Sequence, residues 1–376
     1  MLTLNYSIIS TIKSILLSLS LLSTLGHAED TLPPIKLGMS TALSGPAKEI
    51  GEQLAFGSNI YFDKINADSG INGQNIKLII ADDGYEPKNT VVNTRQFLFS
   101  DNIHAIFGSM GTPTAHAIKP LLDRHRTPFL MPFTGADFLH NNSMPNVFNL
   151  RASYQDEASE QVDYLVKERQ HEKIALMIQA DEFGYVVESN LILALEKYEI
   201  KPIEVARFKR NSEDIAKALT QLKQSKATAI CMVGTYKPLA EFINTGYQQG
   251  FTPDYTAVSF ASSHELYKRI KHPSNIMVTE VVPDPNRCDN AWCVQFNEDI
   301  KPYQRKANRI IFEGYLNAVA LVNAAQKCSP PLNNQCLISK LNALFEEDTD
   351  FAKLFSEQTG NSDKKIYRSY FKSNQD

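Results

Sequence analysis

The sequence lacks the features that would place it outside the ordinary globular proteins. Its 376 residues include 17 Gly, 18 Pro and 1 Trp, without low-complexity tracts, so that disorder and collagen-like repeats are excluded. Lys and Arg number 38 against 42 Asp and Glu, which leaves no basic excess to bind nucleic acid. The length predicts two domains of roughly 150 to 200 residues each.

Catalytic and cofactor motifs are also lacking. The chain has no G-x-S-x-G elbow, phosphate-binding loop or dinucleotide fingerprint. Ser44 has no neighbouring His to act as a base, and the 8 His are scattered without metal-ligand spacing. Asp82 and Asp83 resemble a carboxylate pair, but a solvated turn is expected because both follow a strand directly. The sequence predicts no enzyme, metal or cofactor, and a secreted hydrolase is the weakest alternative.

Long apolar runs are limited to a short one near the N-terminus. After Lys13, Ser14–Leu25 is apolar apart from small hydroxyls, and Gly26-His27-Ala28 follows. This pattern predicts a signal peptide over residues 1–28, because a membrane span needs about 20 apolar residues. No Cys follows the run, so a lipid anchor is not indicated. The mature chain is therefore expected in the periplasm.

The 5 Cys agree with an exported protein. Cys288 and Cys293 lie close together in the sequence, as do Cys328 and Cys336, and in an oxidising compartment such pairs predict two local disulfides. A four-Cys zinc site is the alternative, but zinc knuckles have only about two to four residues between ligands. Cys231 stands in an apolar run and is expected to be a free, buried side chain.

Short apolar runs alternate with amphipathic stretches along the chain. Such alternation predicts parallel sheets covered by helices, and because it starts afresh near Arg151 we expect two sheets. The tail predicts a terminal strand pair, Leu354–Phe355 with Ile366–Phe371, turning at Gly360-Asn361. The other expected strands are Ile35–Met39, Ile76–Ala81, Ala105–Phe107, Phe129–Met131, Ile174–Ile178, Glu204–Arg207, Ala229–Val233, Tyr255–Ser259 and Ile276–Val282.

The loops that follow these strands are the candidate ligand site, because open parallel sheets bind ligands beyond the carboxyl ends of their strands. Each loop alone is typical of a tight turn with a helix cap. Six at one topological position favour a binding site that is polar in the first half and aromatic in the second. They are Ser40–Pro46, Gly108–Thr114, Pro132–Ala136, Asp181–Gly184, Gly234–Lys237 and Ser259–Ser262.

The order and spacing of several short motifs resemble the type I periplasmic binding proteins, and among them the leucine/isoleucine/valine-binding proteins of ABC importers. The resemblance covers the chain from Ile35 to Phe371. The motifs are Leu43–Pro46 with Gly51, Ile65-Asn66, Gly70–Gly73, Asp82-Asp83 with Pro87, Gly108 with Thr112, Pro132–Ala136, Asn149–Tyr154, Phe183-Gly184, Tyr236 and Gly250.

This resemblance implies a Venus-flytrap of two Rossmann-like α/β lobes with parallel sheets, joined by a hinge of three crossovers. The first lobe would comprise residues 33–149 plus 284–346, and the second residues 150–283 plus 347–372. The lobes would close on a small-molecule ligand in the cleft. An ABC permease is the implied partner, and a monomer is expected. The alternative is a sensor that presents the closed form to a membrane kinase or chemoreceptor.

The resemblance also implies a ligand site. Thr112 takes the position of the family's carboxylate-binding hydroxyl and Tyr236 that of its second-lobe aromatic residue. Ala261 stands where the family has an acid for the ligand's ammonium, so an organic acid or amide is favoured over a branched-chain amino acid. Asp181 or Glu182 would replace that acid only if their loop folds inward. The full predicted set is Ser44, Thr112, Phe133, Thr134, Phe183, Tyr236 and Phe260.

Export with processing is the testable outcome of the N-terminal pattern. N-terminal sequencing of the secreted protein should begin at or near Glu29, because Gly26-His27-Ala28 offers small residues at the cleavage site. Recovery of a membrane-bound product that still carries Met1 would contradict the prediction.

Overall fold

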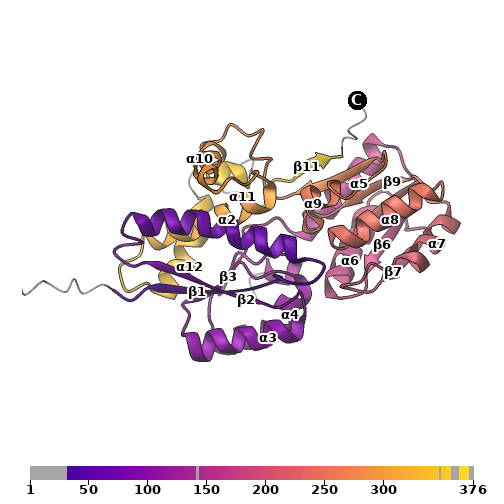
Figure 1. Cartoon of the computed structure of the whole chain (residues 1–376). Helices are drawn as coiled ribbons and strands as arrows, with labels where there is room; N and C mark the ends of the chain where they lie inside the picture. The colour runs from indigo at the N-terminus through magenta and orange to yellow at the C-terminus, as the bar shows by residue number, and fades with distance from the viewer. Residues whose placement is uncertain (1–31, 141–143, 347–348, 357–363, 372–376) are drawn as a thin grey trace, which may run out of the picture. The chain divides into compact units, whose positions relative to one another are not determined.

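Two separate β-sheets organise the chain in the computed structural model, which describes residues 32–140, 144–346, 349–356 and 364–371 (Figure 1). The first sheet has the order β2-β1-β3-β4-β5, and all of its neighbouring strands are parallel. The sequence positions of four of the strands match the expectation, whereas β5 was not expected. The strands are β1 (Ile35–Thr41), β2 (Ile76–Asp82), β3 (Ala105–Phe107), β4 (Phe129–Leu130) and β5 (Val147–Phe148).

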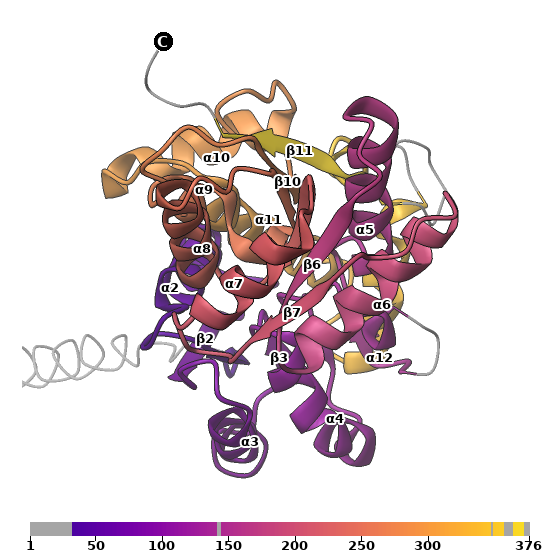
Figure 2. The ribbon, with the colours of Figure 1, turned by 90° about the vertical axis from the view of Figure 1, so that its right-hand side faces the viewer.

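The second sheet has the order β11-β10-β9-β8-β6-β7. Its strands are parallel except for the edge strand β11, which pairs antiparallel with β10. Figure 2 looks toward this sheet, with β6 and β7 labelled among its helices. The strands are β6 (Ile174–Gln179), β7 (Val205–Phe208), β8 (Ala229–Val233), β9 (Asp254–Ala257), β10 (Ile276–Glu280) and β11 (Tyr367–Tyr370).

Helices connect the strands in each half, which confirms the predicted α/β fold class. The chain moves from the first sheet to the second after β5, returns after β10 and reaches the second sheet again at β11. The helices are α2 (Lys48–Ala67), α3 (Pro87–Gln96), α4 (Thr112–His125), α5 (Tyr154–Asp163), α6 (Glu182–Glu196), α7 (Ala216–Ser225), α8 (Tyr236–Gln248), α9 (Ser263–Tyr267), α10 (Ala291–Ile300), α11 (Arg309–Ala325) and α12 (Asn334–Asn342).

Side-chain caps fix where several helices begin. Ser153 and Asp156 form a reciprocal capping box at the start of α5. The Asp181 carboxylate accepts a hydrogen bond from the Gly184 N–H, and the Asn308 side chain accepts from the first turn of α11. The caps of α5 and α6 set the positions of Tyr154 and Phe183, which lie in the first turns of these helices.

The predicted terminal strand pair is wrong. Ala352–Leu354 is a 3-10 turn, and the strand β11 pairs with β10 in the register Val278 to Ser369. Leu354 and Phe355 instead pack with Phe351 in the hydrophobic cluster that underlies the first sheet. Their burial in that cluster outweighs the strand pattern of the segment. The predicted turn at Gly360-Asn361 lies outside the described residues.

The cysteines are arranged as the spacing predicts. Cys288 is bonded to Cys293 and Cys328 to Cys336, while Cys231 is free and buried. Within the described ranges, no group of His, Cys, Asp or Glu could hold a metal ion. The same ranges contain no helix that is long and apolar enough to cross a membrane.

Two glycines allow helices α2 and α11 to pack unusually close together. A Cβ atom at Gly57 would lie 1.9 Å from the Ile311 carbonyl oxygen, and one at Gly314 would lie 2.2 Å from the Leu54 carbonyl oxygen. The Ser58 hydroxyl also donates to the Gly314 carbonyl at 3.0 Å. Helix α2 lies near the start of the chain and α11 near its end, yet the two helices lie side by side in Figure 1.

Replacing Gly314 with Ala should therefore destabilise the protein. In an exposed helix, Gly→Ala stabilises by about 0.5–1 kcal/mol. Here the methyl group meets backbone, and we expect a loss of about 2 kcal/mol or more in the free energy of unfolding. Urea denaturation would measure the change, with the exposed α2 substitution Glu52→Ala as the control. A stabilised Gly314→Ala variant would contradict the close packing.

Candidate functional site

Two hydroxyls at the carboxyl end of the first sheet form the polar centre of the candidate site. Thr112 is the first residue of α4, after β3, and Thr134 lies in the loop after β4. Their Oγ1 atoms are 2.7 Å apart, and both side chains are fully buried. The Tyr154 hydroxyl is 3.4 Å from the Thr134 Oγ1 atom. This group can exchange hydrogen bonds with an acceptor-rich ligand group.

Five buried aromatic rings adjoin this polar centre and come from loops and helix starts that follow strands of both sheets. Phe260, in the 3-10 turn after β9, lies at their middle, with its ring centroid 4.7 Å from Phe183, 5.5 Å from Phe133 and 5.6 Å from Tyr85. The Tyr154 ring is 5.4 Å from Phe183. All five rings are buried, so this ring cluster is an apolar surface shared by both halves of the fold.

The structure brings five of the seven predicted site residues together. Thr112, Thr134, Phe133, Phe183 and Phe260 join the polar centre and the ring cluster through the contacts above. The Thr134 N–H is not available to a ligand, because it donates to the Pro132 carbonyl at 2.8 Å.

Ser44 and Tyr236 contact other residues and do not join this group. Ser44 is exposed, and its N–H donates to the Asp82 carboxylate at 3.2 Å. The buried Tyr236 hydroxyl donates to Glu49, and the Arg269 guanidinium lies 4.5 Å from the centroid of the Tyr236 ring. Tyr236 therefore joins α8 of the second half to α2 of the first, rather than lining the ring cluster.

A buried ion-pair network lies directly beneath the ring cluster. The Arg151 guanidinium donates to both Glu313 oxygens at 2.7 and 2.9 Å and also to the Ser259 hydroxyl. It lies 4.2 Å from the centroid of the Phe133 ring. Glu157 accepts hydrogen bonds from Ser259 and from the Thr279 hydroxyl at 2.6 Å. Arg151 is 2 % exposed and its carboxylate partners are equally buried, so its charge is satisfied within the protein.

The prediction of a solvated turn at Asp82-Asp83 holds for Asp82 but not for Asp83. Asp82 is exposed, as expected, but Asp83 is 1 % exposed and accepts hydrogen bonds from Ser40 at 2.7 Å and from Thr90 at 3.0 Å. The solvated-turn interpretation is therefore wrong for Asp83. Its carboxylate also accepts from the Tyr85 N–H at 2.8 Å. Asp83 thus positions the loop that carries Tyr85 into the ring cluster.

The loop of Asp181 folds inward. Asp181 is 7 % exposed, accepts a hydrogen bond from Gln179 at 2.7 Å and lies 3.7 Å from the Arg210 guanidinium. Burial raises the pKa of Asp181 to about 6, and the hydrogen bonds and Arg210 only partly offset this effect. Tyr85 lies near enough that the Asp181 charge adds to the burial that raises the pKa of the Tyr85 hydroxyl. The Asp181 carboxyl group therefore lies beside the ring cluster, with the Arg210 guanidinium already near it.

The sequence of residues 34–371 matches the model of a family described as periplasmic binding proteins. The chain belongs to this family. The chain is also similar to a Leu/Ile/Val-binding protein homolog of Brucella melitensis, with 24% identity over 220 residues. That alignment covers 58% of this chain and 60% of the relative, so the chain spans less than two thirds of the curated protein that it matches.

Solved structures of the family share nearly the whole fold. A structure from Rhodopirellula baltica, described as a possible leucine/isoleucine/valine-binding protein, superimposes with a TM-score of 0.83 at 28% identity and covers 91% of this chain and 95% of that one. A Streptococcus pneumoniae branched-chain amino acid transporter substrate binding protein, solved with isoleucine, gives 0.75 at 16% identity over 89% and 95%. The resemblance read from the sequence motifs is thus confirmed.

Sequence reasoning missed several residues of this periplasmic binding protein that border the site. Tyr85 and Tyr154 belong to the ring cluster, Arg151 supports it and Arg210 accompanies Asp181. Tyr85 follows β2 directly, so the rule that selected the other loops could have selected it. Arg210 lies beyond the end of β7, where that rule also applies, whereas nothing in the sequence pairs Arg151 with Glu313.

Replacing Asp181 with Asn should stabilise the protein above pH 6. The folded state binds the Asp181 proton more tightly than the unfolded chain, whose carboxyl pKa is near 3.8, so ionisation of Asp181 opposes folding. This penalty is absent below pH 4 and complete above about pH 6. Asn retains the helix cap, so we expect a gain of about 1–2 kcal/mol at pH 7.5 and little change at pH 4. Chemical denaturation at both pH values measures it.

Asp82→Asn is the control, because we expect it to change the stability at pH 7.5 in the opposite direction. Hydrogen bonds from Ser44, Leu43 and Gly84 outweigh the effect of burial and hold the pKa of Asp82 below its usual range. The ionised carboxylate therefore favours folding, and this stabilisation is lost as the pH falls through the pKa of the folded protein. Asp82→Asn should lower stability at pH 7.5. If Asp181→Asn also lowers stability at pH 7.5, its charge is stabilising and our assignment is wrong.

Proposed function

We propose that this protein captures a small organic ligand in the periplasm and delivers it to an ABC importer. The observation that carries the proposal is the hydroxyl pair of Thr112 and Thr134 beside a ring cluster drawn from segments that follow strands of both sheets. Membership of the periplasmic binding protein family and the predicted signal peptide support it. A ligand held by both halves would stabilise their approach over their separation.

Closure about a hinge is the proposed mechanism. We keep the two-lobe division of the sequence analysis as a proposal, with the segment up to Phe355 moved to the first lobe because it packs there. Polar contacts join the two lobes at their facing edges. The Arg210 guanidinium donates to Glu86 at 2.8 Å, Gln53 donates to Glu265 at 2.8 Å, and Asn190 donates to Asp137 at 2.8 Å. Such contacts would strengthen or break as the lobes move.

The chemistry of the site favours an organic acid or amide. The hydroxyl pair offers donors to a carboxylate or amide oxygen, and the buried rings suit a planar or apolar body. Ala261 is buried and supplies no acid, and Arg210 lies beside Asp181, so an ammonium group would lack a free partner. The isoleucine bound by the Streptococcus pneumoniae protein marks the alternative, a branched-chain amino acid.

Sensing is the second proposed role, since a membrane kinase or chemoreceptor would use the same closure. Neighbouring permease and ATPase genes would favour transport, and a kinase gene would favour sensing. We propose neither a catalytic step nor a cofactor. The hydroxyls of Thr112 and Thr134 contact each other, and Thr134 contacts the Tyr154 hydroxyl, rather than a general base. A monomer suffices for the proposed mechanism, because one chain supplies both walls of the site.

A screen of the mature protein tests the ligand class. Thermal-shift measurements over amino acids, organic acids and amides should show stabilisation by an acid or amide, since ligand at 100 times Kd adds about 2.7 kcal/mol. Thr112→Val should then weaken the binding of that ligand by about 1–2 kcal/mol in calorimetry, because one ligand oxygen loses its donor. The exposed α7 substitution Thr220→Val is the matched control. Tight binding of leucine, with acids and amides inactive, would restore the family's amino acid specificity.

A further inference from the structure

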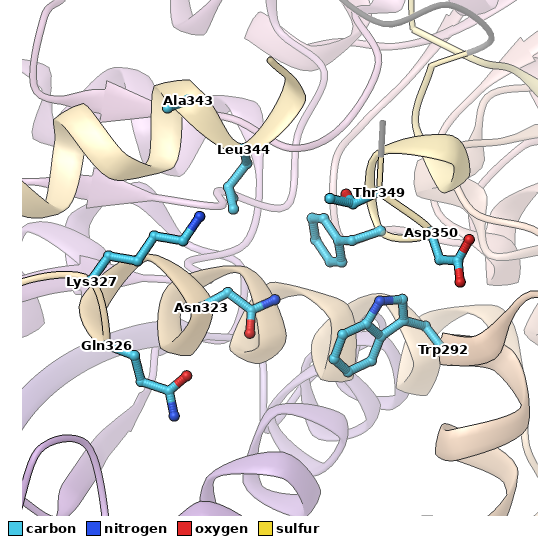
Figure 3. A pocket seen from close by; sticks show the side chains of 9 residues that line it. Trp292, Asn323, Gln326, Lys327, Ala343, Leu344, Thr349 and Asp350 are labelled. Carbon is cyan, nitrogen blue, oxygen red and sulfur yellow. The ribbon is translucent and has the colours of Figure 1, made fainter. Parts of the chain in front are cut away.

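A cavity of about 360 Å³ lies between α10, the end of α11 and the 3-10 turn Ala343–Phe345 (Figure 3). Its lining carries charges of both signs, from Lys327 and Asp350, and therefore favours no single class of ligand. Hydrogen bonds between α2 and the pair of helices α8 and α9 point to a role more directly, because they join the halves of the fold that the proposed mechanism moves.

Five side chains form a network between α2 and the helices α8 and α9. Glu49 and Gln53 are four residues apart on α2 and therefore lie on one helix face. The Glu49 carboxylate accepts hydrogen bonds from the Tyr236 hydroxyl, at the start of α8, and at 3.2 Å from the Arg269 guanidinium, just past α9. Gln53 donates to the Glu265 carboxylate of α9 at 2.8 Å. We call these five side chains the α2 network.

Arg269 is held in position by residues of its own half of the fold. Its guanidinium donates to the Glu265 carboxylate at 2.6 Å and to the Glu265 carbonyl at 2.8 Å, and it lies 4.5 Å from the centroid of the Tyr236 ring. Burial acts to raise the pKa of Glu265, but hydrogen bonds from Arg269 and Gln53 outweigh it and hold the pKa below its usual range. Arg269 is thus a pre-positioned cation that α2 meets with little loss of side-chain entropy.

The α2 network can open without a large electrostatic cost. The Arg269 and Glu49 side chains are 28 % and 24 % exposed, so water reaches both of them when they separate. Glu265 keeps the Arg269 guanidinium of its own segment, and the Lys268 ammonium lies 3.4 Å from its carboxylate. Separation from α2 therefore leaves no buried charge without a partner. A fully buried ion pair could not open so easily.

We propose that the α2 network is a latch that holds the two proposed lobes together and sets the ratio of closed to open molecules. The latch rests on the proposed closure about a hinge and adds to it a contribution that no ligand supplies. Every partner in the network is a side chain of this chain, so its strength does not depend on what the main site binds. A ligand then has to provide only the remainder of the free energy of closure.

The distance between two spin labels tests the latch in the mature protein with no ligand added. The labels are placed at Lys88→Cys on α3 and Lys217→Cys on α7, which are both exposed. Each helix begins a few residues from the contact between Glu86 and Arg210, so separation of the lobes should lengthen the distance. Cys231 is buried and the other native cysteines are in disulfides, so the labels attach to the new thiols.

Pulsed electron spin resonance then gives the populations at short and long distance. Glu49→Gln and Arg269→Gln should each lower the ratio of short to long distance about fivefold or more, because each removes a charge-assisted hydrogen bond across the network. Gln53→Ala should lower it about twofold. The double variant of Glu49 and Arg269 should open little further than either single variant, because both act on one contact. Raising the ionic strength should lower the ratio in the wild type and leave the double variant nearly unchanged.

Two matched controls separate the latch from a general loss of charge. Glu52→Gln removes an exposed acid of α2 that is outside the network, and Arg207→Gln breaks the ion pair with Glu188 inside the second half of the fold. Both should leave the distances unchanged. Circular dichroism and urea denaturation check that each variant is folded, and Gln53→Ala, which alters no charge, remains if a charged variant does not fold.

The outcomes distinguish the latch from ligand capture. Distances in Glu49→Gln, Arg269→Gln and Gln53→Ala that match those of the two controls would overturn the latch, and so would a wild type that shows the long distance alone. If ligands of the thermal-shift screen still stabilise the protein in that case, ligand capture stands without the latch. Opening of the network variants with no stabilising ligand in the screen would support the latch and count against ligand capture.

Discussion

The buried guanidinium of Arg151 is the interaction around which the two halves of this protein are organised. It lies on the segment that leaves the first sheet, contacts Glu313 of α11 and Ser259 of the loop after β9, and supports the ring of Phe133. Removing one member of such a network leaves a buried charge without compensation, which costs about 3–5 kcal/mol. The partners of Arg151 are thereby fixed relative to one another, and the ring cluster is built on them.

This arrangement also determines what the site can offer a ligand. The nearest buried cation is already occupied by carboxylates, so the polar centre acts through neutral hydroxyls instead. The same holds on the opposite side, where Asp181 has Arg210 beside it. A ligand at the proposed site would therefore meet charges that are largely balanced, bordered by aromatic rings. Its recognition would then depend on shape and on hydrogen bonds more than on net charge.

The sequence pattern predicted the strands well because buried strands are short, apolar and bounded by turn residues. Ala105–Phe107 and Ala229–Val233 were placed to the residue. The loop after the first carries Thr112 to the polar centre, whereas Tyr236, after the second, contacts Glu49 and Arg269 instead. The pattern failed at Leu354–Phe355, whose apolar residues pack into a distant core. It also misjudged Asp83, because local polarity does not reveal that Ser40 and Thr90 would enclose the carboxylate. Pairings across long sequence distances, such as Arg151 with Glu313, have no local signal.

The close contact between α2 and α11 has a consequence for the order of events during synthesis. Gly57 meets Ile311, so the first core cannot be completed until the chain beyond α11 has been made. Contacts between such distant segments form slowly, because the long intervening loop must first be closed. The nascent N-terminal half therefore lacks one packed helix of its core until α11 has been made.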